Sequence, residues 1–260
     1  MNILELNEVT KKFGGVTACK DISFSLKSGQ IMGLIGPNGA GKTTTFNLIT
    51  GVYGLTDGNI LFKGKELTGK RPDQIVEAGI SRTFQNIRLF GNLSVLENVC
   101  IAVDRHHTYS FASALLRTRK VRQAEKDIRV QAMEYLKAVG LEDRSHLKAS
   151  SLPYGLQRKL EIARALALKP AILLLDEPAA GMNPEESLEL ARLIRSLKDR
   201  YELAVLLIEH HMDVVMSLCD TIFVMNFGEK LAEGDASEIQ TNPDVLRAYL
   251  GEGYKRVRNQ

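Results

Sequence analysis

Residues 36–44 read Gly36-Pro37-Asn38-Gly39-Ala40-Gly41-Lys42-Thr43-Thr44 and match the phosphate-binding pattern G-x-x-x-x-G-K-[ST] at every fixed position. An apolar run at 31–35 precedes the stretch and predicts a buried strand, and residues 44–49 predict a helix after it. The glycines let successive backbone N–H groups face one concavity at the helix N-terminus, where an anion binds. Lys42 can then reach the β- and γ-phosphates, and the Thr43 hydroxyl can ligate Mg²⁺. The stretch therefore predicts a site for a nucleoside triphosphate.

The composition is that of an ordinary globular protein. Hydrophobic residues make up 44% and charged residues 25% of the 260 positions, so the chain can bury a substantial core. The net charge of +3 is too small to indicate nucleic-acid binding. The three cysteines, Cys19, Cys100 and Cys219, are far apart and follow no metal-ligand spacing, which favours a reduced cytoplasmic environment.

No targeting or membrane-spanning segment is expected. Residues 1–5 carry no basic flank and no long apolar core follows them, so they do not resemble a signal peptide. No uncharged apolar run approaches the roughly 20 residues that cross a bilayer. We therefore expect the chain to act at a membrane only through the transmembrane segments of other proteins.

The order of the predicted elements indicates an α/β fold. Alternating or β-rich patterns separated by glycines predict an antiparallel layer near the N-terminus, at 3–9, 17–26 and 58–64. A capping-box pattern at Ser94 and Glu97 begins a helical region that runs to about residue 150. Continuous apolar runs at 171–175 and 203–208 predict strands that are buried on both faces. We expect a parallel α/β core that is interrupted once by a helical insert.

Candidate catalytic side chains follow the two late strands. Asp176 and Glu177 come directly after the apolar run, where Asp176 can hold Mg²⁺ through water and Glu177 can polarise the attacking water. A surface acidic pair is the weaker alternative, because a buried strand precedes the two carboxylates. The next strand delivers three polar side chains to the same edge: Glu209, His210 and His211.

Two further side chains have open interpretations. Residues 80–84 predict a strand, and Gln85 at its end would face the ligand crevice and touch Mg²⁺ or its water. Taken alone, Gln85 would be an ordinary loop residue. Phe13, which lies before the phosphate loop, either stacks on an adenine base or belongs to the core.

Other local patterns have simpler readings. Asn183 is a suitable N-cap for a helix that has Pro184 at its first position and acidic residues in its first turn. His106 and His107 are interpreted as solvated. The basic cluster at 117–122 is either a solvated face or a contact for an acidic partner or lipid head groups.

Together these residues resemble the ATP-binding-cassette (ABC) ATPase family over essentially the whole chain. The resemblance implies a P-loop NTPase core with an antiparallel β subdomain and an inserted α-helical subdomain, and it implies ATP and Mg²⁺ as ligands. The residues that it implies for binding ATP are Phe13, Gly36, Pro37, Asn38, Gly39, Ala40, Gly41, Lys42, Thr43 and Thr44. Those implied for the metal are Thr43, Gln85 and Asp176, and those implied for catalysis are Glu177 and the switch histidine, His210.

Three segments resemble parts of the family that communicate with other subunits. Gln85 is similar to the glutamine loop, which couples the nucleotide to a transmembrane partner. Gly181 and Asn183 fall in the loop that crosses the dimer. The helix at 159–166 is similar to the signature helix, and the signature loop, which contacts the ATP of the opposite subunit, falls on Pro153, Tyr154, Gly155 and Leu156.

Two positions depart from the family pattern. The signature loop is usually Leu-Ser-Gly-Gly-Gln, and Pro153 stands here in place of the serine, without a hydroxyl or an N–H group. Because the Gly155 N–H and the helix dipole remain, we expect a weakened contact with the partner's ATP rather than a lost one. His211 stands where the family usually has Asp, and we assign the switch role to His210 by its distance from the strand end.

More narrowly, the chain resembles the larger ATP-binding subunit of branched-chain amino acid importers, through residues 82–90, 207–210 and 242–251 and the enlarged helical insert. The resemblance implies a head-to-tail dimer, with itself or with a second ABC ATPase subunit, beneath two transmembrane permease subunits. An extracytoplasmic solute-binding protein would deliver the amino acid, and no nucleic acid is involved. We expect a cytoplasmic chain, peripheral on the inner face of the cell membrane.

The resemblance also sets the expected domain organisation and the alternatives. We expect a single domain over 1–260, with a nucleotide-binding core and β subdomain at 1–88 and 152–235, a helical subdomain at 89–151, and a C-terminal helix and tail at 236–260. The main alternative is the ATPase of another ABC transporter, for another amino acid, urea or lipopolysaccharide. A soluble ABC ATPase acting on ribosomes or DNA is a second alternative, and the Asp-Glu pair argues against a kinase or GTPase.

Overall fold

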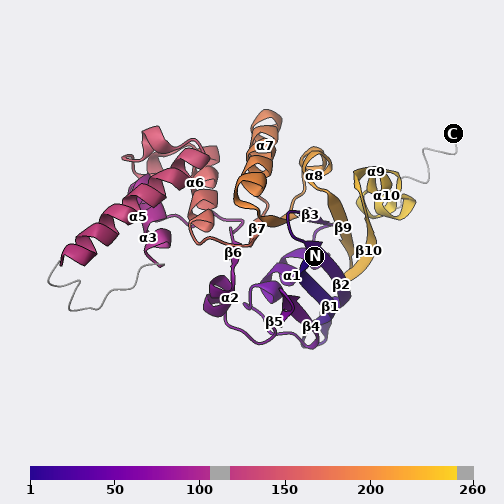
Figure 1. Cartoon of the computed structure of the whole chain (residues 1–260). Coiled ribbons are helices and arrows are strands. Elements are labelled where there is room, and N and C mark those ends of the chain that lie inside the picture. The colour runs from indigo at the N-terminus through magenta and orange to yellow at the C-terminus, as the bar shows by residue number, and fades with distance from the viewer. Residues whose placement is uncertain (106–117, 251–260) are drawn as a thin grey trace. The chain divides into compact units, whose positions relative to one another are not determined.

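The computed structural model describes residues 1–105 and 118–250, and it contains two compact units (Figure 1). One unit consists of Met1–Arg82 and the chain from Ala171 onward, and the other consists of Thr83–Pro170. The second unit is wider than the helical subdomain expected at 89–151, and the subdomain boundaries remain a prediction. His106, His107 and Arg117 lie outside the described residues, as does the end of the predicted tail.

The antiparallel layer expected near the N-terminus is present in the first unit. Its four strands have the order β2-β1-β4-β5, and neighbours run antiparallel. Gly14 and Gly15 connect the first two strands as a two-residue hairpin loop, in which Gly14 has the positive φ, +56°, that such turns favour. The strands are β1 (Asn2–Phe13), β2 (Val16–Lys27), β4 (Asp57–Phe62) and β5 (Lys65–Glu66).

The second sheet of this unit has the strand order β10-β9-β3-β8-β7-β6 and is parallel except for β10. Every residue of β3, β7 and β8 is buried, as their continuous apolar runs predict. The strands are β3 (Ile31–Ile35), β6 (Ile80–Arg82), β7 (Ile172–Asp176), β8 (Ala204–Ile208), β9 (Thr221–Asn226) and β10 (Glu229–Gly234).

The strand predicted over 80–84 is shorter than expected. β6 ends at Arg82, which lies opposite Leu174 of β7, and the chain enters the second unit at Thr83. β7 continues to Asp176, but the pairing of β6 with it stops at Arg82, where the chain leaves the sheet. Gln85 therefore lies three residues beyond the strand and not at its end.

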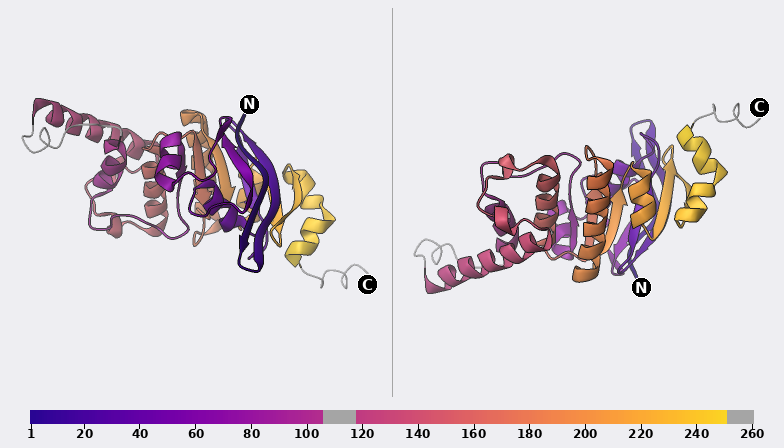
Figure 2. Two further views of the ribbon diagram at one scale, coloured as in Figure 1. Left: turned by 90° about the horizontal axis from the view of Figure 1, so that it is seen from below. Right: turned by 90° about the horizontal axis from the view of Figure 1, so that it is seen from above.

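Both faces of the parallel sheet are covered, one by α7 and α8 and the other by α1 and the antiparallel sheet. Figure 2 shows the antiparallel sheet on one side, seen from below, and α7 and α8 on the other, seen from above. α1 belongs to the core that the two sheets share, because its buried residues cluster with those of both sheets. The helices of this unit are α1 (Lys42–Ile49), α2 (Pro72–Ala78), α7 (Pro184–Tyr201), α8 (Met212–Leu218), α9 (Ala236–Thr241) and α10 (Pro243–Leu250).

Both helix starts that the sequence indicates by capping residues are confirmed. Asn183 Oδ1 accepts the N–H of Glu186 at 2.9 Å at the start of α7. In the second unit, Ser94 Oγ accepts the N–H of Glu97 at 3.1 Å, and the Ser94 N–H donates to the Glu97 carboxylate at 2.7 Å. These reciprocal bonds satisfy N–H groups that have no partner within the first turn.

The second unit is helical. It contains α3 (Val95–Asp104), α5 (Arg119–Ala138) and α6 (Tyr154–Leu166), with short 3₁₀ turns at Glu142–Arg144 and Ala149–Ser151. The described part of the basic cluster lies at the start of α5, where Arg119, Lys120 and Arg122 are exposed. Over residues 1–105 and 118–250, no helix is both long and apolar enough to span a membrane.

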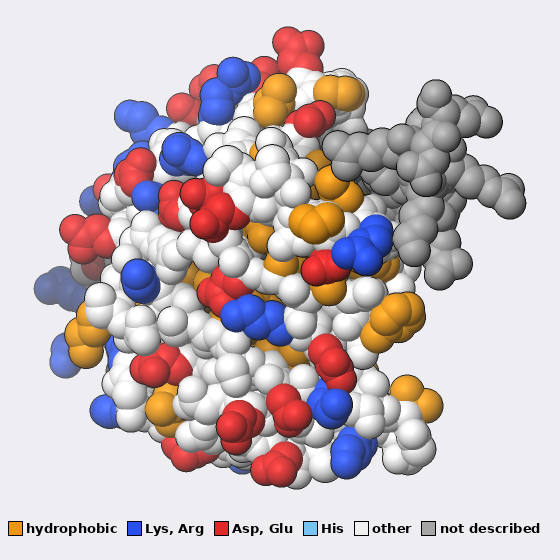
Figure 3. Space-filling model, turned by 90° about the vertical axis from the view of Figure 1, so that its right-hand side faces the viewer, with side chains coloured by type: hydrophobic (Ala, Val, Ile, Leu, Met, Phe, Trp, Pro, Cys, Tyr) orange, Lys and Arg blue, Asp and Glu red, His pale blue; other side chains and the backbone are white. Residues whose placement is uncertain are grey.

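The surface of the side that carries β10, α9 and α10 is mixed in character. Figure 3 shows acidic, basic and hydrophobic side chains interspersed over this face. Neither sign of charge gathers into one field there, in keeping with a net charge of only +3.

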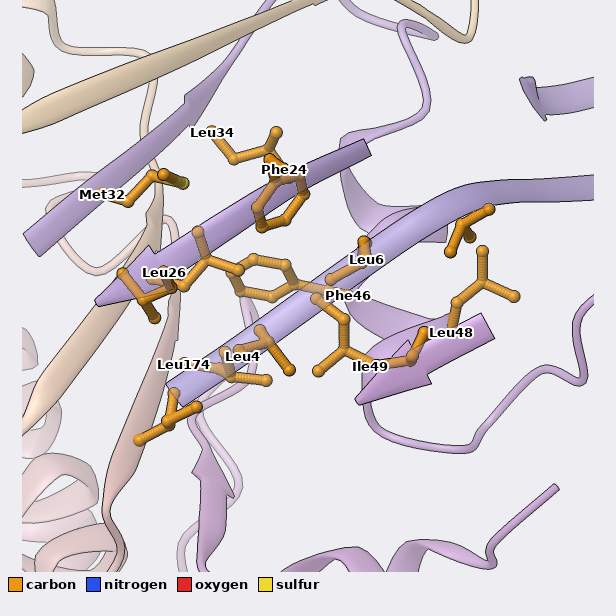
Figure 4. Close-up of a cluster of buried hydrophobic side chains, with 14 of the residues drawn as sticks. Leu4, Leu6, Phe24, Leu26, Met32, Leu34, Phe46, Leu48, Ile49 and Leu174 are labelled. Atoms are coloured by element: carbon orange, nitrogen blue, oxygen red, sulfur yellow. The ribbon is translucent and has the colours of Figure 1, made fainter. Parts of the chain in front are cut away.

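The core between the two sheets is built around Phe46 of α1. Its side chain is fully buried and points among Leu4, Leu6 and Ile49 (Figure 4). The same cluster includes Leu174 of β7, so the helix after the phosphate loop, the antiparallel layer and the parallel sheet share one apolar contact region. This packing fixes the start of α1 relative to the strand ends.

Replacing Phe46 by alanine should lower the free energy of unfolding by about 3–5 kcal/mol, because it leaves a cavity among well-packed neighbours. Urea denaturation followed by circular dichroism measures the change. Leu188→Ala on α7 is the control, since Leu188 is 41% exposed and should change stability by only about 0.5 kcal/mol. Equal losses for the two variants would contradict this description of the core.

Candidate active site

Three strand ends meet at one edge of the parallel sheet. Ile208 of β8 pairs with Leu34 of β3 on one side and with Asp176 of β7 on the other. The phosphate loop after β3, the carboxylates at the end of β7 and the histidines after β8 therefore lie at the same level. Ligands of open parallel sheets bind at this carboxyl edge.

The backbone of the phosphate loop requires glycine at two positions. A Cβ atom on Gly36 would lie 2.1 Å from the carbonyl oxygen of Met225 in β9. A Cβ atom on Gly41, whose φ is +101°, would lie 2.6 Å from the carbonyl oxygen of Ala18 in β2. The fixed glycines of the pattern thus let the loop pass close to two neighbouring strands, and Gly41 also caps the start of α1.

Lys42 lies beneath the loop and is only 6% exposed. Its Nζ donates hydrogen bonds to the carbonyl oxygens of Gly36 at 2.7 Å and Pro37 at 3.0 Å. Burial lowers the pKa of Lys42, while the nearby charges of Glu177 and Asp176 act in the opposite direction. A phosphate group in the loop would give this ammonium an anionic partner.

Asp176 is held by a buried ion pair that the sequence analysis did not identify. Its Oδ2 accepts a hydrogen bond from Arg82 Nη2 at 2.6 Å, and both side chains are less than 10% exposed. Arg82 Nη1 also donates to Asn47 Oδ1 of α1 at 2.7 Å. Arg82 therefore connects β6, the Asp176 carboxylate and the helix after the phosphate loop.

The donor set at this edge fits a magnesium ion. The Asp176 carboxylate and the exposed hydroxyl-bearing Thr43 at the start of α1 supply oxygen donors, which Mg²⁺ prefers. Gln85, the third predicted metal-site residue, is exposed and belongs to the other compact unit, so its role at the metal stays a prediction.

Glu177 and His210 are brought together although they are 33 residues apart. His210 Nε2 lies 2.9 Å from Glu177 Oε1. Glu177 has a positive φ of +47°, and its N–H donates to the carbonyl oxygen of Ile208 at 2.9 Å. A non-glycine residue in this left-handed region is strained, and such strain is concentrated at functional sites.

Glu209 supports this pair from within the protein; the sequence analysis placed it at this edge of the sheet but assigned it no role. Its carboxylate is 1% exposed. Oε1 accepts the N–H of Ala179 at 2.7 Å, and Oε2 accepts the N–H groups of His210 at 2.9 Å and His211 at 3.2 Å. Glu209 thus ties the loop after Glu177 to the histidine segment. An acidic residue next to a fully buried strand was the available signal.

His211 has a different environment from His210. Its Nδ1 lies 3.2 Å from the buried Glu209 Oε2, whereas His210 is turned toward Glu177. This placement supports His210 for the switch role, which remains a prediction.

Phe13 is not a core residue. Its ring lies at the end of β1 and is 43% exposed, so the core alternative is wrong. Tyr53 packs against it edge-on with ring centroids 5.1 Å apart, and Lys11 Nζ lies 4.9 Å from the ring centroid. The exposed ring supports the adenine contact, which remains a prediction. Tyr53 is a second aromatic residue that the sequence analysis did not consider.

The segments predicted to reach other subunits are exposed except at Gly155 and Leu156, which are half-buried. Gly181, with a φ of +77°, and the N-cap residue Asn183 form the loop between Glu177 and α7. In the helical unit, Pro153 is the N-cap of α6, and Tyr154 at its first position is 44% exposed. Contacts of either segment with a partner stay predictions.

The match to a protein-family model decides the family. Residues 19–180 match the model described as "ABC transporter", which is more than half of the chain. The chain belongs to the ABC transporter ATP-binding family. Residues 229–255 of this cassette also match a model described as "Branched-chain amino acid ATP-binding cassette transporter".

Several curated relatives match the cassette over nearly its whole length. LivG of Salmonella typhimurium, a high-affinity branched-chain amino acid transport ATP-binding protein, is 45% identical over 96% of this chain and 98% of its own. BraF of Pseudomonas aeruginosa, with the same description, is 44% identical over the same shares. A probable LivG of Methanocaldococcus jannaschii is 33% identical over 97% of this chain and 98% of its own.

Solved structures confirm the fold. An ATP-binding cassette of an ABC transporter in its ADP conformation superposes with a TM-score of 0.84 at 31% identity, covering 97% of this chain and all of that one. A dimeric cassette in a post-hydrolysis state with ADP and Pi gives a TM-score of 0.75 at 25% identity, covering 90% of this chain and 98% of that one. The cassette is an ATPase with the P-loop NTPase core, antiparallel layer and helical unit that the sequence predicts.

Replacing Glu209 by glutamine should lower ATP turnover while leaving ATP affinity nearly unchanged. Both carboxylate oxygens of Glu209 accept backbone N–H groups. In glutamine an NH₂ group replaces one of these oxygens and cannot accept a hydrogen bond, so a buried N–H loses its partner. An unsatisfied buried group of this kind costs about 1–3 kcal/mol. Turnover and nucleotide binding by the purified protein measure the two effects. Glu229→Gln is the control, because Glu229 is an exposed carboxylate paired with Lys20. Unchanged turnover in Glu209→Gln would remove Glu209 from the support of the site.

Proposed function

We propose that this cassette is the ATP-hydrolysing subunit of an importer that takes up branched-chain amino acids through a membrane permease. The observation that best supports ATP hydrolysis is the 2.9 Å contact between Glu177 Oε1 and His210 Nε2, at the edge of the sheet where the phosphate loop begins. The substrate follows from the resemblance to LivG and BraF, and from the family model that matches residues 229–255.

The phosphate loop would bind the β- and γ-phosphates of ATP. Backbone N–H groups of the loop and of the first turn of α1 face the anion, and Lys42 adds a positive charge at the γ-phosphate. Thr43 and Asp176 would hold Mg²⁺, which when bound neutralises charge that develops on the phosphate oxygens. Phe13 would present its ring to the adenine base.

Glu177 would act as the general base. It accepts a proton from the water that attacks the γ-phosphorus, the bond to the β-phosphate oxygen breaks, and ADP and phosphate leave. His210, beside Glu177, orients this carboxylate and the γ-phosphate. Glu209 keeps both segments in place through its bonds to the backbone of Ala179 and His210.

The importer assigned to this cassette needs partners. A second cassette subunit or a second copy would pair head to tail with it, so that each signature loop completes the other's ATP site. Two permease subunits would receive the closing motion, and an extracytoplasmic binding protein would deliver the amino acid. The cassette would then be peripheral on the inner face of the membrane.

Reconstitution of the transporter in liposomes tests the proposal. With ATP enclosed on the cassette side, radiolabelled leucine, isoleucine or valine should accumulate when the binding protein is supplied on the opposite side. Uptake of another solute in place of these amino acids would assign the cassette to another ABC transporter. ATP hydrolysis without uptake of any solute would contradict an importer.

Glu177→Gln should bind Mg-ATP but lose turnover by about 10²–10⁴-fold, because the amide cannot accept the proton of the attacking water. Phosphate release measures turnover, and equilibrium binding of a fluorescent ATP analogue measures affinity. Glu185→Gln, in the exposed first turn of α7, should behave as the wild type. Near-normal turnover by the Glu177 variant would assign the base to another group.

Pro153→Ser should raise ATP turnover of the dimer. The serine supplies a hydroxyl that can donate to the γ-phosphate of the partner's ATP, and a hydrogen bond to a charged group is worth about 1.5–3 kcal/mol. Pro153→Ala is the matched control, since it restores the N–H group but adds no hydroxyl. If both variants have the wild-type rate, the missing serine does not limit turnover.

A further inference from the structure

Two charged residues are buried in the helical unit, on the helix that follows the signature loop. Arg158 and Glu161 of α6 are 1% and 4% exposed. Arg158 Nη1 donates to Glu161 Oε2 at 2.8 Å, one turn further along the helix. Burial of such a pair costs desolvation, and an apolar pair of similar size often stabilises a protein as well or better. The pair is therefore not explained by packing alone.

The pair also makes hydrogen bonds to the backbone of residues 84–88. Arg158 Nη1 donates to the carbonyl oxygen of Phe84 at 2.6 Å, and Arg158 Nη2 donates to the carbonyl oxygen of Gln85. Glu161 Oε1 accepts the N–H of Arg88 at 2.7 Å. We call this set of contacts the clasp.

The segment that the clasp holds has no helix or strand of its own. Three of its backbone groups, the carbonyl oxygens of Phe84 and Gln85 and the N–H of Arg88, bond to α6 side chains and not to a regular ladder, so α6 helps to set its position. These contacts are to main-chain atoms of the segment and not to its side chains. The helix begins at Tyr154, so Arg158 lies about one turn after that residue, on the same helix as Tyr154, Gly155 and Leu156 of the signature loop.

We propose that Arg158 and Glu161 are positioning residues that make the glutamine-loop segment 84–88 and the signature helix move as one body. A permease subunit that displaces this segment would then displace the signature loop, and with it the contact to the partner's ATP. The inference rests on the proposed function, because the permease and the partner's ATP are parts of it.

Arginine suits this position for a geometric reason. Its planar guanidinium has several N–H donors in fixed directions and here serves Phe84, Gln85, Glu161 and, at 3.2 Å, the hydroxyl of Tyr154. A lysine ammonium is a point charge that cannot hold these acceptors together. Arg158→Lys should therefore be impaired in coupling although the charge is kept.

The decisive variant removes both charges at once. Arg158→Met combined with Glu161→Leu leaves no unpaired buried charge, so the helical unit should remain folded. The carbonyl oxygens and the N–H of segment 84–88 then lose their partners on α6. Leu136→Ala is the matched control, because Leu136 is fully buried on α5 of the same unit and its truncation costs stability without removing a clasp bond.

ATP hydrolysis is measured for the purified cassette and for the complete complex with its permease in the same lipid. We expect the double variant to keep the basal rate of the isolated cassette but to lose stimulation by the permease about fivefold or more. Leu136→Ala should keep its ratio of stimulated to basal rate. Hydrogen exchange should show the Arg88 amide protected in the wild type and exchanging in the double variant.

Full permease stimulation of the double variant would overturn the clasp as a coupling device. So would an equal loss of stimulation in Leu136→Ala, since coupling would then follow stability alone. If the wild-type cassette has no permease whose presence changes its hydrolysis, the proposed function fails and this inference fails with it. The wild-type measurement alone distinguishes this failure of the proposed function from the two variant results that would overturn only the clasp.

Discussion

The insertion of β8 between β3 and β7 is the constraint on which the site depends. Because Ile208 is in register with Leu34 on one side and with Asp176 on the other, three chain segments reach the same edge of the sheet. Each of the three strands is buried along its whole length, and a shift in register would expose or bury the wrong residues. The apolar core thus determines the separation between the phosphate loop, Glu177 and His210.

Buried charges then fix the loops that leave this framework. Glu209 joins the backbone after Glu177 to the histidine segment, and Arg82 joins Asp176 to α1. In the helical unit, Arg158 and Glu161 do the same for the glutamine-loop segment. Irregular segments have few backbone bonds of their own, so a buried carboxylate or guanidinium can hold them in one geometry.

Much of this arrangement was predictable from local sequence. The phosphate loop, the apolar strands and the N-cap at Asn183 depend on neighbouring residues, and the family follows from their order. The support of the site was not predictable, because Arg82 and Asp176 are 94 residues apart and Arg158 and Gln85 are 73 apart. Their pairing depends on tertiary packing. The strand predicted over 80–84 was too long for the same reason, because the point at which the chain leaves the sheet depends on tertiary structure and not on these residues alone.

Purification of the cassette with its natural partners tests most directly whether ATP hydrolysis here serves amino acid import. A tagged Glu177→Gln chain is isolated from solubilised membranes with Mg-ATP present, and the co-purifying proteins are identified by mass spectrometry. The import function predicts membrane proteins with several transmembrane segments, together with a second cassette subunit or further copies of this chain. Ribosomal or DNA-associated proteins without any membrane protein would contradict the transport function and leave only the ATPase.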